Sequence, residues 1–81
     1  MYKEVFAIRI KSIRKELGLS QICVSKETGI DQSRISKYET GELQPDLEKL
    51  GILANYYEVS IDWLLGNPHK NRRGEGSNEV N

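Results

Sequence analysis

The sequence has one cysteine, Cys23, and no long hydrophobic run. A single cysteine cannot form an internal disulfide, which suits a protein of the reducing cytoplasm. No apolar run approaches the roughly 18 residues of a membrane-spanning helix, so we expect no membrane partner. The N-terminal segment carries charges at Lys3, Glu4 and Arg9 and does not resemble a signal peptide. We therefore expect a cytoplasmic protein.

Residue types that form catalytic and metal sites are equally scarce. The lone His69 lies in a polar stretch, and Cys23 has neither a second cysteine nor a nearby histidine with which to bind zinc or act as a nucleophile. The chain also lacks a glycine-rich phosphate loop and a pair of carboxylates suited to acid–base chemistry. We predict that the protein is not an enzyme and has no metal ion or cofactor.

The formal net charge is zero, because the charges of twelve basic and twelve acidic side chains cancel. The distribution is uneven: residues 1–40 carry eight basic and five acidic side chains, whereas residues 41–65 carry one basic and five acidic ones. A chain polarised in this way can orient one face toward phosphates. An ordinary solvated surface would also explain these charges, so the charge pattern alone does not decide for nucleic acid.

With 81 residues, the chain is limited to one domain with a small core, and its apolar periodicity is helical. Five helices are expected, over residues 3–17, 21–28, 32–40, 46–56 and 61–65. The apolar faces of these helices consist mainly of Phe6, Ile10, Ile13, Leu17, Val24, Ile35, Tyr38, Leu47, Leu50, Leu53, Ala54, Tyr57 and Leu64. We assign the domain to residues 1–66. Residues 67–81 have almost no apolar side chain and are expected to be a disordered tail.

Residues 21–40 contain two of the expected helices joined by a tight turn. Ser20 and Asp31 are suitable N-caps for the two helices. Gly29 stands at the turn, where it can adopt a positive φ without steric cost, and small Ser25 lies where the helices must approach closely. This is the helix-turn-helix pattern, which presents its second helix to the major groove of DNA.

The outward face of residues 32–40 is rich in hydrogen-bond donors. Glutamine can pair bidentately with adenine, lysine and arginine can donate to guanine, and serine can contact either. The predicted base-reading residues are Gln32, Ser33, Ser36 and Lys37, with Arg34 at the edge of the face. Arg34 could equally bind a phosphate or remain in solvent. Ser20 and Gln21 begin the preceding helix, where side chains and exposed amides can contact phosphates.

Several short motifs follow one another along roughly residues 5–66: LGLSQ, GI, ISKYE with a later glycine, PDLEKL and SIDWLLG. In this order they resemble the Cro/cI-type (XRE-like) helix-turn-helix family of bacterial and phage transcriptional regulators. The resemblance implies an all-α, compact, five-helix, lambda-repressor-like DNA-binding domain. It also implies a homodimer on a two-fold-related operator in double-stranded DNA, with repression by occlusion of a promoter.

The functional positions of this family can be carried over residue by residue. They add Thr40 as a phosphate contact. Arg14 either forms a buried ion pair with Glu39, as in some members, or contacts a phosphate. Ile22 and Cys23 depart from the family, because charged residues are common at these positions.

The end of the expected domain is where a second molecule could bind. Trp63, Leu65 and Tyr57 are assigned to a dimer interface, although Trp63 and Leu65 could instead belong to the core. An alternative function is an antitoxin or anti-repressor that binds a protein partner through the fourth and fifth expected helices or the tail. The acidic residues 41–65 and an exposed Trp63 motivate this alternative. The DNA-binding regulator is the leading hypothesis because the face of residues 32–40 suits base contact.

Overall fold

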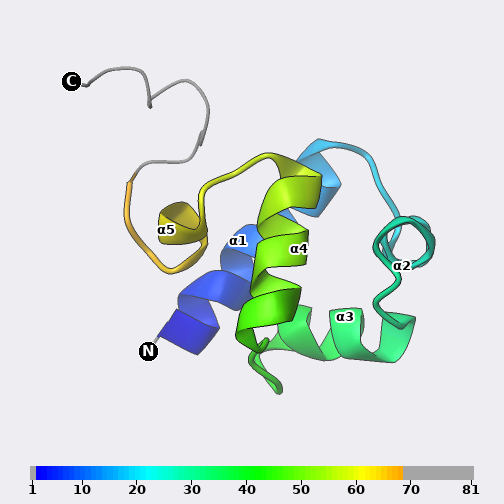
Figure 1. Cartoon of the computed structure of the whole chain (residues 1–81), viewed down its shortest axis with the longest axis horizontal. Helices are drawn as coiled ribbons and strands as arrows, with labels where there is room; N and C mark the ends of the chain where they lie inside the picture. Colours follow the sequence, from blue (N-terminus) through cyan, green and yellow to red (C-terminus); the bar gives the residue numbers. More distant parts are fainter. Residues whose placement is uncertain (1, 69–81) are drawn as a thin grey trace.

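The computed structural model describes residues 2–68, which form a bundle of short helices (Figure 1). The helices are α1 (Tyr2–Glu16), α2 (Gln21–Thr28), α3 (Gln32–Thr40), α4 (Leu47–Tyr57) and α5 (Ile61–Leu64). No strand occurs among these residues, so the prediction of an all-α fold is confirmed. None of the described helices is long and apolar enough to cross a membrane. The expected disordered tail lies, from residue 69 onward, outside the described residues.

Four helices begin at a side chain that caps them. Ser20 and Asp31, which the sequence predicts as caps, accept hydrogen bonds from the backbone amides three residues ahead, at 3.0 and 3.1 Å. Ser60 accepts in the same way from the amide of Trp63 at 2.9 Å. Asp46 does the same at the start of α4, where the amide of Lys49 donates at 2.8 Å. Each cap satisfies an amide that has no partner within the helix, which fixes where α2 to α5 begin.

Left-handed residues end three of these helices. Gly29 after α2 has a φ of 81°, as predicted, and Gly41 after α3 has a φ of 84°. After α4 the same conformation is adopted by Glu58, with a φ of 57°, the one non-glycine residue with positive φ in the described range. A side chain in this conformation costs roughly 1–2 kcal/mol, because Cβ crowds the following carbonyl oxygen.

All five helices contribute to one core. Its buried side chains are Phe6, Ile10, Ile13, Val24, Ile30, Ile35, Tyr38, Leu50, Leu53, Ala54, Tyr57, Val59 and Leu64. Helix α3 packs against both α1 and α2, and the rings of Phe6 and Tyr38 meet edge to face with their centroids 6.0 Å apart. Since α3 uses its inner face for this packing, its other face is exposed to solvent.

Two leucines that periodicity assigned to the core are exposed instead. Leu17 is 52% exposed and Leu47 is 86% exposed. Leu17 follows the last residue of α1, and Leu47 is the first residue of α4. The ends of a helix can extend beyond the helices packed against it. An apolar residue there is exposed even when it lies on the apolar face that the helical periodicity predicts. At the start of α4 the buried residue is Pro45.

The short helix α5 is tied to α1 by Arg9. The Nη1 atom of Arg9 donates to the carbonyl oxygens of Trp63 at 2.6 Å and Asn67 at 2.8 Å. The guanidinium also lies 4.9 Å from the centroid of the Trp63 ring, within the range of a cation–π interaction. Arg9 thus holds the C-terminal end of a four-residue helix to the body of the domain.

Candidate nucleic-acid interface

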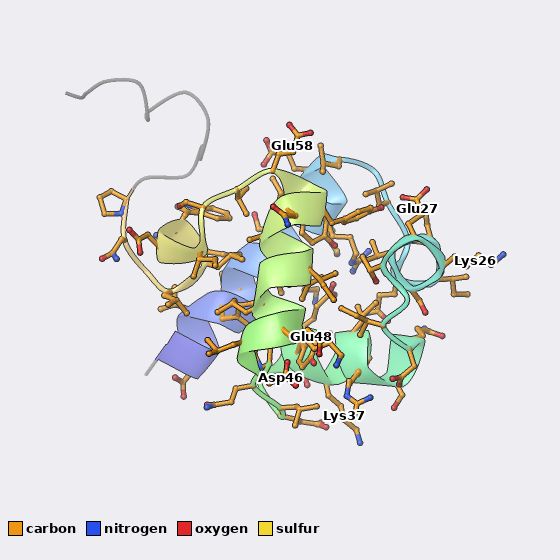
Figure 2. The ribbon with its side chains drawn as sticks, viewed as in Figure 1. Lys26, Glu27, Lys37, Asp46, Glu48 and Glu58 are labelled. Carbon is orange, nitrogen blue, oxygen red and sulfur yellow. The ribbon has the colours of Figure 1, made fainter. Side chains whose placement is uncertain are left out.

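Helix α3 presents a polar face to solvent. Its inner face is buried through Ile35, Tyr38 and Glu39. The side chains predicted to read bases lie outside: Gln32, Ser33, Arg34 and Lys37 are exposed and Ser36 is half-buried. Figure 2 shows the side chain of Lys37 extending from α3 away from the body of the domain. The structure therefore brings the predicted base-reading residues together on one exposed element.

A buried ion pair joins α1 to α3. Arg14 donates from Nε to Oε2 of Glu39 at 2.7 Å and from Nη2 to Oε1 at 2.9 Å, while Nη1 donates to the carbonyl oxygen of Leu19 at 2.7 Å. Only 9% of Arg14 and 8% of Glu39 is exposed. The hydrogen bonds with Glu39 raise the pKa of Arg14 above its usual value.

This geometry confirms the expected pair of Arg14 and Glu39, and it argues against the alternative assignment of Arg14 as a phosphate contact. Its three guanidinium nitrogens are already engaged inside the protein, and breaking a buried, bidentate pair to reach a phosphate would leave Glu39 unpaired. Arg14 therefore has a structural role.

Gln21 connects this buried pair to the exposed face. Its Nε2 atom donates to Oε1 of Glu39 at 3.1 Å, and its Oε1 atom accepts from Nε2 of Gln32 at 3.3 Å. Because an ionised carboxylate can only accept, the NH2 group of Gln21 must face Glu39 and its carbonyl oxygen must face Gln32. Gln32 then keeps one N–H and its own carbonyl oxygen outside. These are the groups that adenine requires.

The connection from Glu39 through Gln21 to Gln32 is the feature that sequence reasoning missed. The sequence predicts a phosphate contact for Gln21, a base contact for Gln32 and an ion pair for Glu39. The separations of 11 residues between Gln21 and Gln32 and of 18 residues between Gln21 and Glu39 give no sign that these side chains touch. Only the packing of α2 against α3 brings them together.

The remaining predicted DNA contacts lie at the ends of α2 and α3. Ser20 is exposed, and its Oγ accepts from the amide of Cys23. Thr40 is exposed, and its hydroxyl donates to the carbonyl oxygen of Lys37 at 3.1 Å. Each of these hydroxyls is thus held in place by the backbone of its own helix end.

Arg34 at the edge of α3 pairs with the N-cap. Its Nη1 atom donates to Oδ1 of Asp31 at 3.0 Å, and its backbone amide donates to Oδ2 of the same residue at 3.1 Å. The amide hydrogen bond is the main cause that holds the pKa of Asp31 below its usual value. Unlike the pair of Arg14, this pair is open to solvent.

Of the three residues assigned to a dimer interface, one is in the core. Tyr57 is 5% exposed, and its buried hydroxyl has no hydrogen-bond partner within residues 2–68. It lies on the inward face of α4, so that assignment is corrected, and burial raises the pKa of its hydroxyl. Trp63 and Leu65 are half-buried against the core and retain surface for a partner. Among the described residues, no three His, Cys, Asp or Glu side chains are grouped so that they could hold a metal ion.

Five helices with α2 and α3 in this arrangement define a helix-turn-helix domain of the lambda-repressor-like type. A family model described as "Helix-turn-helix" matches residues 10–64, which is most of the chain. The chain belongs to the Cro/cI-type (XRE-like) helix-turn-helix family.

The chain is similar in sequence to several curated proteins, of which three are described here. It is 38% identical over 65 residues to the SPbeta prophage-derived uncharacterized HTH-type transcriptional regulator YonR of Bacillus subtilis, covering 80% of this chain and 60% of that protein. It is 33% identical over 67 residues to the HTH-type transcriptional regulator ImmR of Bacillus subtilis, covering 83% and 53%. It is 38% identical over 58 residues to the cryptic phage CTXphi transcriptional repressor RstR of Vibrio cholerae, covering 72% and 52%. The chain thus spans little more than half the length of these curated relatives.

Proposed function

We propose that the chain is a sequence-specific, DNA-binding transcriptional regulator that represses by occupying a two-fold-related operator as a homodimer. The observation that carries this proposal is the row of exposed polar side chains on α3, a helix whose opposite face is buried. The family membership and the printed names of the relatives, which are transcriptional regulators and a phage repressor, support it.

Base recognition falls to α3 lying in the major groove. Gln32 offers an adjacent N–H and carbonyl oxygen, which match N7 and the N6 amino group of adenine. Lys37 offers a charged donor that matches the acceptors of guanine, and Ser33 and Ser36 supply hydroxyls that suit several base edges. Because Gln21 fixes the orientation of the Gln32 amide, adenine is favoured at that position over bases that present the opposite pattern.

Phosphate contacts set the register of α3 in the groove. Ser20 and Gln21 lie at the N-terminus of α2, where free backbone amides point outward and the helix dipole favours an anion. Thr40 lies at the other end of the recognition face. Such contacts position the protein on the duplex, whereas the side chains of α3 select the sequence.

Two copies are required for a two-fold-related site. In a homodimer of this class the two recognition helices enter successive major grooves about 34 Å apart. We place Trp63 and Leu65 at the contact between copies because both are aromatic or aliphatic and only half-buried in one chain. Repression then follows from competition with polymerase for the same promoter DNA.

Selection from a random duplex pool tests the proposal directly. The purified chain is incubated with the pool at about 100 mM potassium chloride, since affinities for DNA depend strongly on salt. We expect enrichment of a palindromic site with half-sites one helical turn apart, bound at least roughly 10³-fold more tightly than random duplex. Sedimentation of the complex should show two chains per site. A chain that prefers no duplex over random competitor contradicts the proposal.

A further inference from the structure

The carboxylate of Asp31 makes two interactions with Arg34 at the start of α3. One oxygen caps the helix by accepting from the amide of Arg34, and the other holds the Arg34 guanidinium at 3.0 Å. The two side chains are 57% and 51% exposed, so the pair lies at the surface. Arg34 is therefore turned back toward the helix N-terminus in the free chain.

The position of this pair places a negative charge beside the proposed DNA contact. Asp31 immediately precedes Gln32, the first residue of the recognition helix. A duplex that approaches this face brings phosphates toward the carboxylate. While Arg34 is held by Asp31, the two charges cancel, and Arg34 is not available to neutralise a phosphate.

An exposed ion pair of this kind exchanges partners readily. Such pairs typically contribute no more than about 1 kcal/mol, because water competes for both charges. Arginine and phosphate form charge-assisted, often bidentate hydrogen bonds. A phosphate held within reach of Arg34 can therefore replace Asp31. The buried pair of Arg14 and Glu39 cannot exchange in this way, because its three guanidinium nitrogens are enclosed.

We propose that Arg34 is a conditional phosphate contact, which Asp31 withholds from loose, sequence-independent complexes with DNA. In loose, sequence-independent complexes Arg34 stays with Asp31. In the operator complex, base contacts hold α3 in the groove, and Arg34 moves from Asp31 to a DNA phosphate. Asp31 thus lowers the salt dependence of binding to random duplex, whereas the operator complex has the salt dependence of the full set of phosphate contacts. This inference rests on the DNA-binding function proposed above.

The test compares the full chain with Asp31→Asn. Asparagine caps a helix about as well as aspartate but cannot hold an arginine by charge. On random duplex, we expect the plot of log K against log salt concentration to become steeper by about 0.9, which is the contribution of one added phosphate contact. On the operator the slope should stay the same. The affinity for the operator should rise at least as much as the affinity for random duplex, because the parent chain must break the pair of Asp31 and Arg34 to form the operator complex.

Three further variants separate a specific effect from a general one. Asp62→Asn removes the same charge from an exposed position on α5, and we expect it to leave the slope on random duplex unchanged. In an Arg34→Gln background, Asp31→Asn should also have no effect on that slope. Asp31→Ser, which keeps the cap with another side chain, should reproduce Asp31→Asn.

Three results would overturn the inference: an unchanged slope for Asp31→Asn and Asp31→Ser, an equal change for Asp62→Asn, or a change that persists in the Arg34→Gln background. If the parent chain prefers a selected operator and one of these results is found, this inference alone fails. If the parent prefers no duplex at all, the proposed function fails, and the inference fails with it.

Discussion

Arg14 on α1 and Glu39 on α3 meet as a buried, bidentate pair, with Nε and Oε2 separated by 2.7 Å. Glu39 also accepts a hydrogen bond from Gln21, which in turn contacts Gln32 on the recognition face. The same carboxylate therefore fastens two helices together and orients a side chain that we propose reads DNA. Under the proposed function, stability and DNA recognition are therefore linked at Glu39.

Loss of one partner from the pair should be severe. Arg14→Ala leaves the Glu39 carboxylate buried without its counter-charge, and we expect the free energy of unfolding to fall by about 3–5 kcal/mol. Urea denaturation followed by circular dichroism measures this loss. The matched control is Arg34→Ala, which breaks an exposed pair and should cost less than about 1 kcal/mol. Similar losses in the two variants would show that burial does not distinguish the pairs.

Removal of a base contact should affect binding without affecting the fold. Lys37 is exposed on α3, so Lys37→Ala should weaken operator binding by about 1–3 kcal/mol while the thermal midpoint stays nearly unchanged. Fluorescence anisotropy with the selected operator measures the first quantity and a melting curve the second. Lys11→Ala, an exposed lysine on α1, provides the control for loss of positive charge. Equal operator affinity in parent and Lys37→Ala would remove Lys37 from the base-reading set.

Alkaline pH should break a hydrogen bond between α4 and α2 and so destabilise the domain. The hydroxyl of Tyr56 donates to Glu27, and this hydrogen bond is the main cause that raises the pKa of Tyr56 to about 12. A pKa raised on folding means that the contribution to stability is complete below the unfolded value near 10 and is lost as pH rises from about 10 to 12. The pKa values of Tyr38 and Tyr57 are raised too, mainly by burial.

The Tyr56→Phe variant isolates one of these contributions. Its melting temperature should start lower at pH 9 and fall less steeply than that of the parent between about pH 10 and 12, because one of the titrating groups is gone. Melting curves over this range measure the difference. Parallel curves for parent and variant would mean that the pKa of Tyr56 does not change on folding.

The left-handed residue after α4 offers a route to a more stable domain. Glu58 adopts a φ of 57°, where glycine carries no Cβ strain. We expect Glu58→Gly to raise the free energy of unfolding by about 0.5–1 kcal/mol, a fraction of the left-handed penalty, since glycine also adds entropy to the unfolded chain. Glu58→Ala removes the same side chain but retains the strain, so the difference between the two variants measures the backbone effect alone. Equal stabilities would refute the expectation.

Local signals predicted the helices well. The caps at Ser20, Asp31 and Ser60 and the glycine at position 29 act within a few residues, so the sequence reveals them directly. Periodicity was wrong for Leu17 and Leu47 because burial depends on whether a neighbouring helix extends that far. No pattern within one helix contains that information.

The candidate site was predicted in part. The exposed face of α3 follows from its period, and the spacing of Asp31 and Arg34 is the i,i+3 spacing of helical pairs, which sequence alone could have indicated. The pair of Arg14 and Glu39 was expected only through family resemblance. Contacts such as Gln21 to Gln32 depend on the crossing of two helices and have no local signal.

The hydrogen bonds of Arg9 at the end of α5 should affect how this helix opens. A four-residue helix has too few internal hydrogen bonds to persist alone, yet Arg9 on α1 binds one carbonyl oxygen within it, that of Trp63, and one beyond it, that of Asn67. Deuterium should therefore enter the hydrogen-bonded amides of Leu64 and Leu65 only when the whole domain opens, and not through separate fraying of this short helix.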